Sequence, residues 1–101
     1  MNDELIQAGD LTLNLGTRTV TRGSRKIKLS PHECNLLKHL MKHAGHVVLR
    51  DHLLRKIWNY QPDIESRVVD VYMGYLRKKL DSRTTQKLIK TVRGRGYMLE
   101  A

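Results

Sequence analysis

The chain has 101 residues, which suffices for one domain, residues 1–101, with a single modest hydrophobic core. Lys and Arg number 19 and Asp and Glu 10, so the formal net charge is +9, a balance typical of proteins that bind a polyanion. No apolar run reaches the roughly 20 residues that span a bilayer, no signal-peptide pattern opens the chain, and the single cysteine excludes an internal disulfide. We therefore expect a soluble cytoplasmic protein.

The first thirty residues alternate in the manner of short strands. Leu11, Leu13 and Leu15 recur at every second position, and Ile27 and Leu29 alternate with lysines. Turn residues occur at 15–17 and 22–24. These patterns predict a small antiparallel sheet with one face exposed to solvent.

Residues 30–58 are predicted to form two helices joined by a short extended link at 46–49. Ser30 can cap the first helix, Pro31 suits its first position, and Glu33 completes a capping box. Gly45 is expected to end this helix, whose inward stripe is Cys34, Leu37, Met41 and Ala44, with Leu40 beside it. The second helix, from about Arg50 to Trp58, lacks a capping side chain and is expected to bury Leu53, Leu54 and Ile57.

A third helix, from about residue 65 to residue 80, is predicted to have two different faces. At about 100° per residue, the stripe that packs on the core consists of Val69, Met73, Leu76 and Leu80. The opposite face carries Arg67, Val71, Gly74, Tyr75 and Lys78. After a polar turn at 81–86, residues 88–92 and 97–99 are predicted to pair as a hairpin with the tip Arg93-Gly94-Arg95-Gly96. The predicted fold class is α+β.

Most of the positive charge lies in this last third of the chain. Between residues 67 and 95 there are nine cations and two acids, which accounts for +7 of the +9. A helix with such an outer face fits the major groove of B-DNA, and a basic hairpin can reach the neighbouring backbone or minor groove. Duplex DNA binding is therefore the leading hypothesis.

Other chemistries are not indicated. His39 and His43 have the i, i+4 spacing of helical metal ligands, but no third ligand follows nearby, so a surface pair is favoured over a zinc site. Cys34 lies on the predicted inward stripe, and Gly94-Arg95-Gly96 lacks the strand-to-helix setting of a phosphate-binding loop. We expect no enzymatic activity, no cofactor and no metal.

Four separated motifs carry a resemblance to a known family. In chain order they are Leu29-Ser30-Pro31-x-Glu33, Leu53-Leu54-x-x-x-Trp58, Arg67-Val68-Val69-Asp70-Val71 continuing to Leu76-Arg77-Lys78-Lys79-Leu80, and Thr91-Val92-Arg93-Gly94-x-Gly96-Tyr97. From about Leu5 to Leu99 the chain resembles the C-terminal DNA-binding domain of OmpR/PhoB-type response regulators. The resemblance implies a winged helix-turn-helix with an N-terminal four-stranded antiparallel sheet, three helices and a C-terminal hairpin wing.

The resemblance also implies site residues. On the recognition helix, about 65–80, the residues implied to face bases in the major groove are Val71, Tyr75 and Arg77. The residues implied to contact phosphates or backbone are Trp58, Arg67, Tyr72, Gly74, Lys78, Thr91 and Tyr97. In the wing, about 91–97, Arg93 and Arg95 are expected at the minor groove. The loop implied to contact RNA polymerase comprises Asn59, Tyr60, Gln61, Pro62, Asp63 and Ile64.

The chain departs from the family pattern at two adjacent positions of the recognition helix. Gly74 stands where the family often has a cation, so one phosphate contact is expected to be missing. Tyr75 stands where an arginine can read guanine, which leaves packing on a thymine methyl or donation to a backbone oxygen. Cys34 replaces a frequent core phenylalanine. A receiver domain with its phosphorylatable aspartate is not among these residues, so we expect an excised effector domain or a stand-alone relative.

The expected function is sequence-specific binding of double-stranded DNA by a bacterial two-component transcriptional regulator, in the cytoplasm at the nucleoid. The resemblance implies two copies bound head to tail on tandem direct-repeat sites, with a sensor kinase acting through the receiver domain. The isolated domain is expected to be monomeric because it lacks a second apolar stripe. Two alternatives stay open: a winged-helix protein-interaction module and a basic RNA-binding protein. The charge concentration argues against the first, and the scarcity of exposed aromatic residues against the second.

Overall fold

The architecture consists of two antiparallel sheets joined by three helices. The computed structural model describes residues 4–59, 65 and 67–101. Strands β1 (Leu5–Ala8), β2 (Leu11–Asn14), β3 (Thr19–Arg22) and β4 (Arg25–Lys28) form a meander in the order β1-β2-β3-β4, as predicted. Leu11, Leu13 and Val20 point inward and are fully buried, whereas the alternate positions of β2 and β3 are only half-buried. Arg22 follows Val20 by two residues, so it shares the inward face and is buried too.

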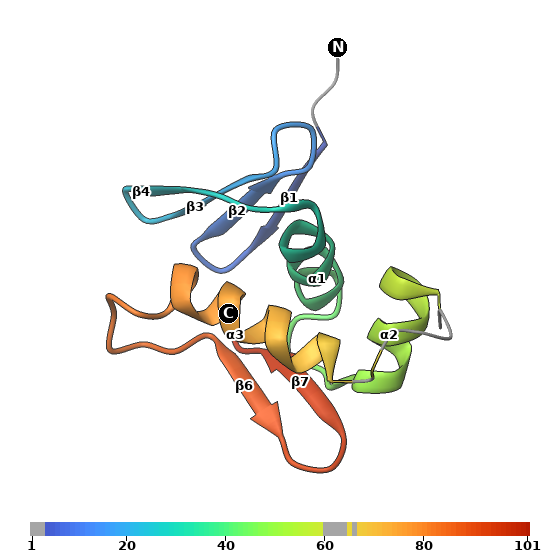
Figure 1. Cartoon of the computed structure of the whole chain (residues 1–101). Coiled ribbons are helices and arrows are strands. Elements are labelled where there is room, and N and C mark those ends of the chain that lie inside the picture. The colour runs from blue at the N-terminus through green and yellow to red at the C-terminus, as the bar shows by residue number, and fades with distance from the viewer. Residues whose placement is uncertain (1–3, 60–64, 66) are drawn as a thin grey trace.

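Helix α1 (Pro31–Lys42) lies at the centre of the molecule, next to α2 (Arg50–Trp58) and α3 (Val68–Leu80) (Figure 1). The predicted capping box is present: the Glu33 amide donates to Ser30 Oγ at 3.3 Å, and the Ser30 amide donates to Glu33 Oε1 at 2.8 Å. Helix α2 has the predicted bounds, and Leu49 before it gives no side-chain cap. Ile57, which we expected in the core, is only partly buried, while Trp58 is buried.

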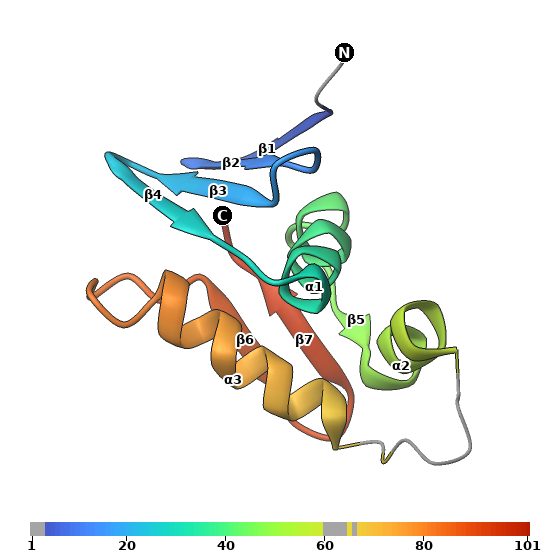
Figure 2. The same cartoon turned by 45° about the horizontal axis from the view of Figure 1, so that its top comes forward.

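The C-terminal hairpin pairs β6 (Ile89–Val92) with β7 (Gly96–Leu99), close to the predicted bounds. The extended link before α2 becomes a third strand, β5 (Val48–Leu49), which pairs with β7 through Val48 opposite Tyr97 and Leu49 opposite Gly96. The sequence predicted the link as extended but not this pairing. The β6–β7 turn lies at the N-terminal end of α3, in both views (Figures 1 and 2).

A buried ion pair connects the first sheet to the turn that follows α3. Asp81, which begins the predicted polar turn, is only 4% exposed, and its Oδ1 lies 2.8 Å from Arg22 Nη1. Arg22 also donates to the carbonyl oxygens of Leu80 at 2.7 Å and Gln86 at 2.5 Å. The Asp81 carboxylate accepts from the amides of Leu88 and Ile89. These bonds position the base of the hairpin relative to α3.

Candidate nucleic-acid interface

Helix α3 divides into the two faces that its sequence predicts. Val69, Met73, Leu76 and Leu80 are fully buried, whereas Val71 and Tyr75 on the opposite side are 47% and 50% exposed. The burial of the first set anchors the helix in the core, so that the second set faces outward. Gly74 lies between Val71 and Tyr75 on this outer face and is also exposed.

The helix begins at Val68, three residues later than the predicted start near residue 65. Arg67 occupies the N-cap position with φ −68° and ψ −10° and provides no side-chain cap. The preceding turn closes through a bond from the Val68 amide to the Glu65 carbonyl oxygen at 3.0 Å. Arg67 is exposed at the N-terminus of this helix, a position where phosphates are commonly held.

The hairpin turn projects two arginines into solvent. The Arg95 amide donates to the Val92 carbonyl oxygen at 3.0 Å, which closes the turn, and Gly94 within it has φ +73°, a conformation that favours glycine. Arg93 and Arg95 are both exposed. The Arg50 amide at the start of α2 donates to the Arg95 carbonyl oxygen at 3.1 Å, so the tip is also attached to α2.

Arg77, which was expected to face bases, lies half-buried against the hairpin. Its guanidinium donates to the Ile89 carbonyl oxygen at 3.3 and 3.4 Å and to Thr91 Oγ1, and its centre lies 5.4 Å from the Tyr97 ring centroid. These contacts hold β6 and β7 at a defined position beside α3. Thr91 itself remains exposed.

Tyr97 and Asp70 form a second connection between the hairpin and α3. Tyr97 is 5% exposed, and its hydroxyl, which was expected to reach a phosphate, donates to Asp70 Oδ1. Arg50 Nε lies 3.2 Å from the same oxygen, so Asp70 joins α2, α3 and β7. Burial, together with the hydrogen bond to and the charge of Asp70, raises the pKa of Tyr97 to about 12. The phenol therefore remains a donor throughout the physiological pH range.

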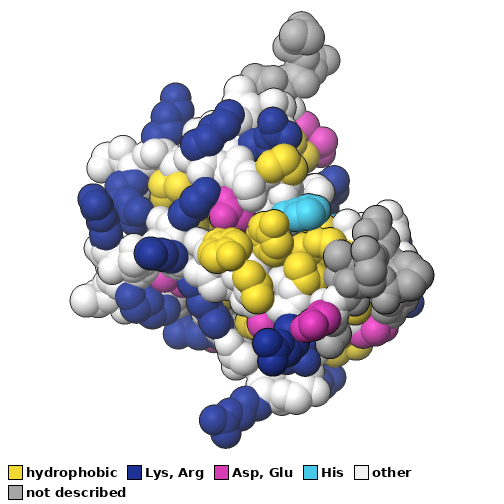
Figure 3. Space-filling model, viewed as in Figure 1, with side chains coloured by type: hydrophobic (Ala, Val, Ile, Leu, Met, Phe, Trp, Pro, Cys, Tyr) yellow, Lys and Arg dark blue, Asp and Glu magenta, His cyan; other side chains and the backbone are white. Residues whose placement is uncertain are grey.

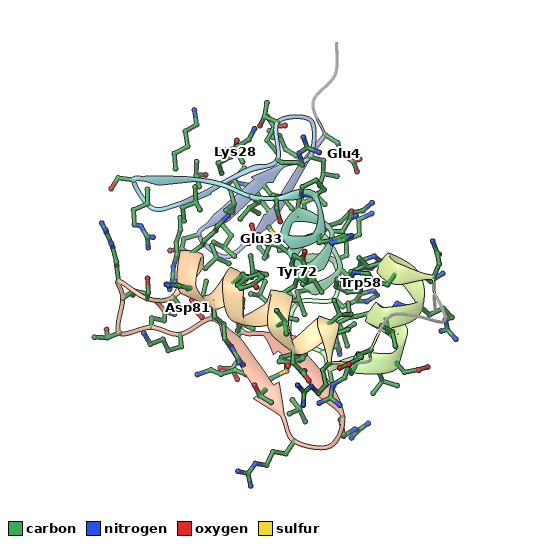
Figure 4. The ribbon with its side chains drawn as sticks, in the orientation of Figure 1. Glu4, Lys28, Glu33, Trp58, Tyr72 and Asp81 are labelled. Atoms are coloured by element: carbon green, nitrogen blue, oxygen red, sulfur yellow. The ribbon has the colours of Figure 1, made fainter. Side chains whose placement is uncertain are left out.

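Four aromatic rings from three helices are in contact, and we call them the aromatic row: His32 of α1, Trp58 of α2, and Tyr72 and Tyr75 of α3. Centroid separations are 4.9 Å for His32–Trp58, 5.0 Å for His32–Tyr72 and 5.3 Å for Tyr72–Tyr75. Trp58 and Tyr72 lie where α1, α2 and α3 approach one another (Figure 4). Sequence reasoning did not select His32, because the contact arises only when three helices meet.

Basic side chains lie mainly above, to the left of and below the apolar side chains at the centre of this view (Figure 3). Lys78 is exposed, one turn beyond Gly74. Lys79 instead bonds Glu33 Oε1 at 2.6 Å and the Lys28 carbonyl oxygen at 3.1 Å. Burial alone would raise the pKa of Glu33, but the bonds from Lys79 and Ser30 outweigh it and lower that pKa. Lys79 thus supports the start of α1.

The loop expected to contact RNA polymerase falls largely outside the described residues. Asn59 ends α2 in a left-handed conformation with φ 56°, and its amide bonds the Arg55 carbonyl oxygen at 3.1 Å. Tyr60, Gln61, Pro62, Asp63 and Ile64 are not described.

The predicted histidine pair has a third neighbour. His52 of α2 lies beside it, with ring centroids 6.0 Å from His39 and 6.5 Å from His43, both edge to face. Within the described part of the chain, no group of three His, Cys, Asp or Glu side chains has an arrangement suited to a metal ion. The described helices also include none that is long and apolar enough to cross a membrane.

A three-helix unit whose last helix displays one face beside a basic hairpin defines a winged helix-turn-helix domain, a class of DNA-binding fold. Residues 24–99 match the family model described as "Transcriptional regulatory protein, C terminal". The chain is 44% identical to the transcriptional regulatory protein TrcR of Mycobacterium tuberculosis, over 96% of this chain and 37% of that protein. It is 41% identical to the phosphate regulon regulator PhoB of Rhizobium meliloti, over 96% of this chain and 43% of that protein.

A solved structure of the same kind is that of the RstA DNA-binding domain of Klebsiella pneumoniae in complex with the RstA box. It has a TM-score of 0.81 and 37% identity, and the match covers 96% of this chain and 97% of that one. The chain therefore belongs to the C-terminal DNA-binding domains of OmpR/PhoB-type transcriptional regulators, which are not enzymes. It spans about two fifths of the length of these curated relatives.

Proposed function

We propose that this domain binds a specific double-stranded DNA site with α3 in the major groove and the β6–β7 wing at the adjacent backbone and minor groove. The observation that carries the proposal is the exposure of Val71 and Tyr75, 47% and 50%, on a helix whose other face is fully buried. A side chain that is exposed at the middle of such a face can reach base edges. The core beneath keeps the helix rigid as it does so.

Basic and polar residues near this centre are proposed to position the helix on the duplex. Arg67 at the start of α3, Lys78 near its end, and Thr91 at the wing are exposed and suit phosphate contacts, which carry no sequence information. The backbone at Gly74 can approach a phosphate closely. Arg93 and Arg95 are proposed to reach the minor groove, whose narrow stretches attract arginine.

Three residues expected to touch DNA receive a supporting role in this proposal. Arg77 already donates to the wing, at the Ile89 carbonyl oxygen, and the Tyr97 hydroxyl already donates to Asp70. Trp58 is 5% exposed within the aromatic row. We propose that they hold the wing and Tyr72 in place and thereby act on DNA indirectly.

The test compares duplex DNA, duplex RNA and single strands by fluorescence anisotropy at several salt concentrations. Neutralising four to six phosphates should give a log–log slope of about −4 to −5 for duplex DNA. A slope near zero, or equal affinity for the three nucleic acids, would contradict the proposal and favour the protein-interaction or RNA-binding alternatives.

Substitutions separate the helix from the wing. Val71→Ala or Tyr75→Ala should weaken the free energy of binding to the specific DNA site by about 1–3 kcal/mol and leave non-specific binding nearly intact. Arg93→Ala should weaken both and flatten the salt slope by about one unit. Lys26→Ala, which removes one exposed charge from β4, is the matched control and should change neither quantity. Full discrimination between site and scrambled duplexes by the Val71 and Tyr75 variants would show that another face of α3 meets the bases.

For the whole regulator, we propose that two copies bind tandem direct repeats head to tail and that a sensor kinase acts through a receiver domain. The isolated domain should be monomeric without DNA. The Asn59-to-Ile64 loop is proposed to contact RNA polymerase. Sedimentation with and without a tandem duplex tests the first of these points, because a tight dimer at micromolar concentration without DNA would contradict it.

A further inference from the structure

The part of α3 that is proposed to read bases, Val71, Gly74 and Tyr75, presents an apolar surface, and we call it the base-reading centre. Within the described chain only four large hydrophobic residues are exposed, and two of them, Val71 and Tyr75, lie one turn apart on this face. A Cβ added at Gly74 between them would meet no atom within 4 Å, so the surface is open there. Figure 3 shows apolar side chains at the middle of this view, with Lys and Arg mainly above, to the left of and below them.

The ring of Tyr75 is held by its neighbours. It meets Tyr72 edge to face at 5.3 Å and 81°, and Tyr72 in turn contacts Trp58 at 5.6 Å. Trp58 is 5% exposed and belongs to the core cluster, so the aromatic row links Tyr75 to the interior. An aromatic ring that is already ordered loses little conformational entropy when it packs on a ligand.

Arg77, the one arginine within α3, already bonds inside the protein and is not available for reading guanine. A bidentate contact with guanine needs a guanidinium fork directed at its O6 and N7 atoms. The Nε and one terminal nitrogen of Arg77 donate to the Ile89 carbonyl oxygen, and that same nitrogen donates to Thr91 Oγ1. Turning this fork toward a base would break the contacts that position the wing.

We propose that α3 recognises thymine methyl groups in the major groove through Val71 and Tyr75, and that no arginine of this helix reads guanine at the centre of the half-site. The C5 methyl of thymine is the apolar group that major-groove edges display, and it matches an apolar surface. The inference rests on the proposed function, since it assumes that α3 enters the major groove. The inference specifies which base Val71 and Tyr75 contact within the DNA segment that one domain binds, namely thymine.

The test begins with selection of a preferred duplex from a random library by the full chain. Each thymine of the enriched half-site is then replaced by deoxyuridine, which deletes the methyl group and keeps the pairing. At one or two adjacent positions the wild-type dissociation constant should rise about fourfold per methyl, the effect expected for one buried methyl group. Replacing guanines by 7-deazaguanine, which lacks the N7 acceptor, should have little effect at those central positions.

Protein variants connect the effect to the proposed residues. Val71→Ala and Tyr75→Ala should each lose the difference between thymine and uracil at one of these positions. Leu5→Ala removes another exposed hydrophobic side chain, which is 60% exposed on β1 and lies outside the proposed interface, and this variant should keep the wild-type difference. Circular dichroism confirms that each variant is folded.

The outcomes distinguish the two proposals. An enriched duplex that binds equally well with uracil, or that depends on guanine N7 at its centre, would overturn this inference while sequence-specific binding stands. The same holds if both alanine variants keep the full thymine preference. If no duplex is enriched, the proposed function fails and this inference fails with it.

Discussion

Two glycines near the proposed DNA-binding surface serve opposite purposes. Gly74 lies in the middle of α3 with open space where a side chain would be, and it leaves the proposed base-reading surface open between Val71 and Tyr75. At Gly96, an added Cβ would lie 2.9 Å from Leu49 Cα and from the Val48 carbonyl carbon, because β5 passes directly beside β7. Gly74 thus affects the shape of the exposed surface, whereas Gly96 is required for the pairing of β5 with β7.

This contrast gives a prediction with its own control. Gly96→Ala should force β5 and β7 apart, lower the midpoint of urea unfolding, and weaken DNA binding because the wing loses its position. Gly74→Ala should raise stability by up to about 1 kcal/mol, because alanine is the better helix former. Equal stability of the Gly96→Ala variant and the wild type would show that β5 does not pair with β7 as described.

At the scale of elements, the contact between α1 and α2 includes three histidines surrounded by cations. Burial and the neighbouring charges of His52, Lys38, His43 and Lys42 lower the pKa of His39. The pKa of His52 is lowered first by burial and then by the charges of Arg55, Lys56 and His43. Folding therefore opposes protonation of both rings, so the unfolded chain binds more protons just below the ordinary histidine pKa.

The sign of the resulting pH dependence follows from this difference. Stability should be full above the ordinary histidine pKa of about 6.5 and should fall as the pH decreases below it, because the histidines of the unfolded chain are protonated first. His39→Gln combined with His52→Gln should flatten this decrease, measured by urea unfolding at each pH. His46→Gln, at an exposed histidine outside this contact, is the control and should keep the wild-type decrease. An unchanged slope in the double variant would mean that other groups cause it.

At the scale of the molecule, Arg22 and Asp81 connect the N-terminal sheet to the wing. Both side chains are 6% exposed. Asp81 also accepts hydrogen bonds from the amides of Leu88 and Ile89, where the wing segment begins. Removing one member of a buried pair leaves the other charged and without compensation. The first sheet, which lies away from the proposed interface, therefore contributes to the geometry of the DNA-binding surface.

Asp81→Ala should accordingly lower the free energy of unfolding by about 3–5 kcal/mol. Glu100→Ala removes the exposed pair with Lys90, which has a separation of 3.8 Å, and should cost less than about 1 kcal/mol. If urea unfolding gives similar losses for both, the connection through Asp81 is not a principal support of the fold. In variants that remain folded, proton chemical shifts of the wing residues report whether the wing has moved.

Local patterns were sufficient for most of the elements. The capping box of Ser30 and Glu33, the turn glycines and the two-residue alternation of leucines act over a few residues, so their consequences can be inferred from neighbours alone. The same holds for the faces of α3, because helical periodicity separates Val69 and Met73 from Val71 and Tyr75. The exposed part of the candidate site was therefore predictable.

Contacts between residues far apart in the sequence had no such signal. The sequence by itself determined the elements, the outward face of α3 and the basic wing tip, since each depends on local geometry and charge. Only the tertiary structure decided that β5 joins the wing sheet, that Asp81 is buried with Arg22, and that Arg77 and Tyr97 turn toward the wing and Asp70. A polar side chain has the same local pattern whether water or a distant partner satisfies it, and packing alone determines which one it meets.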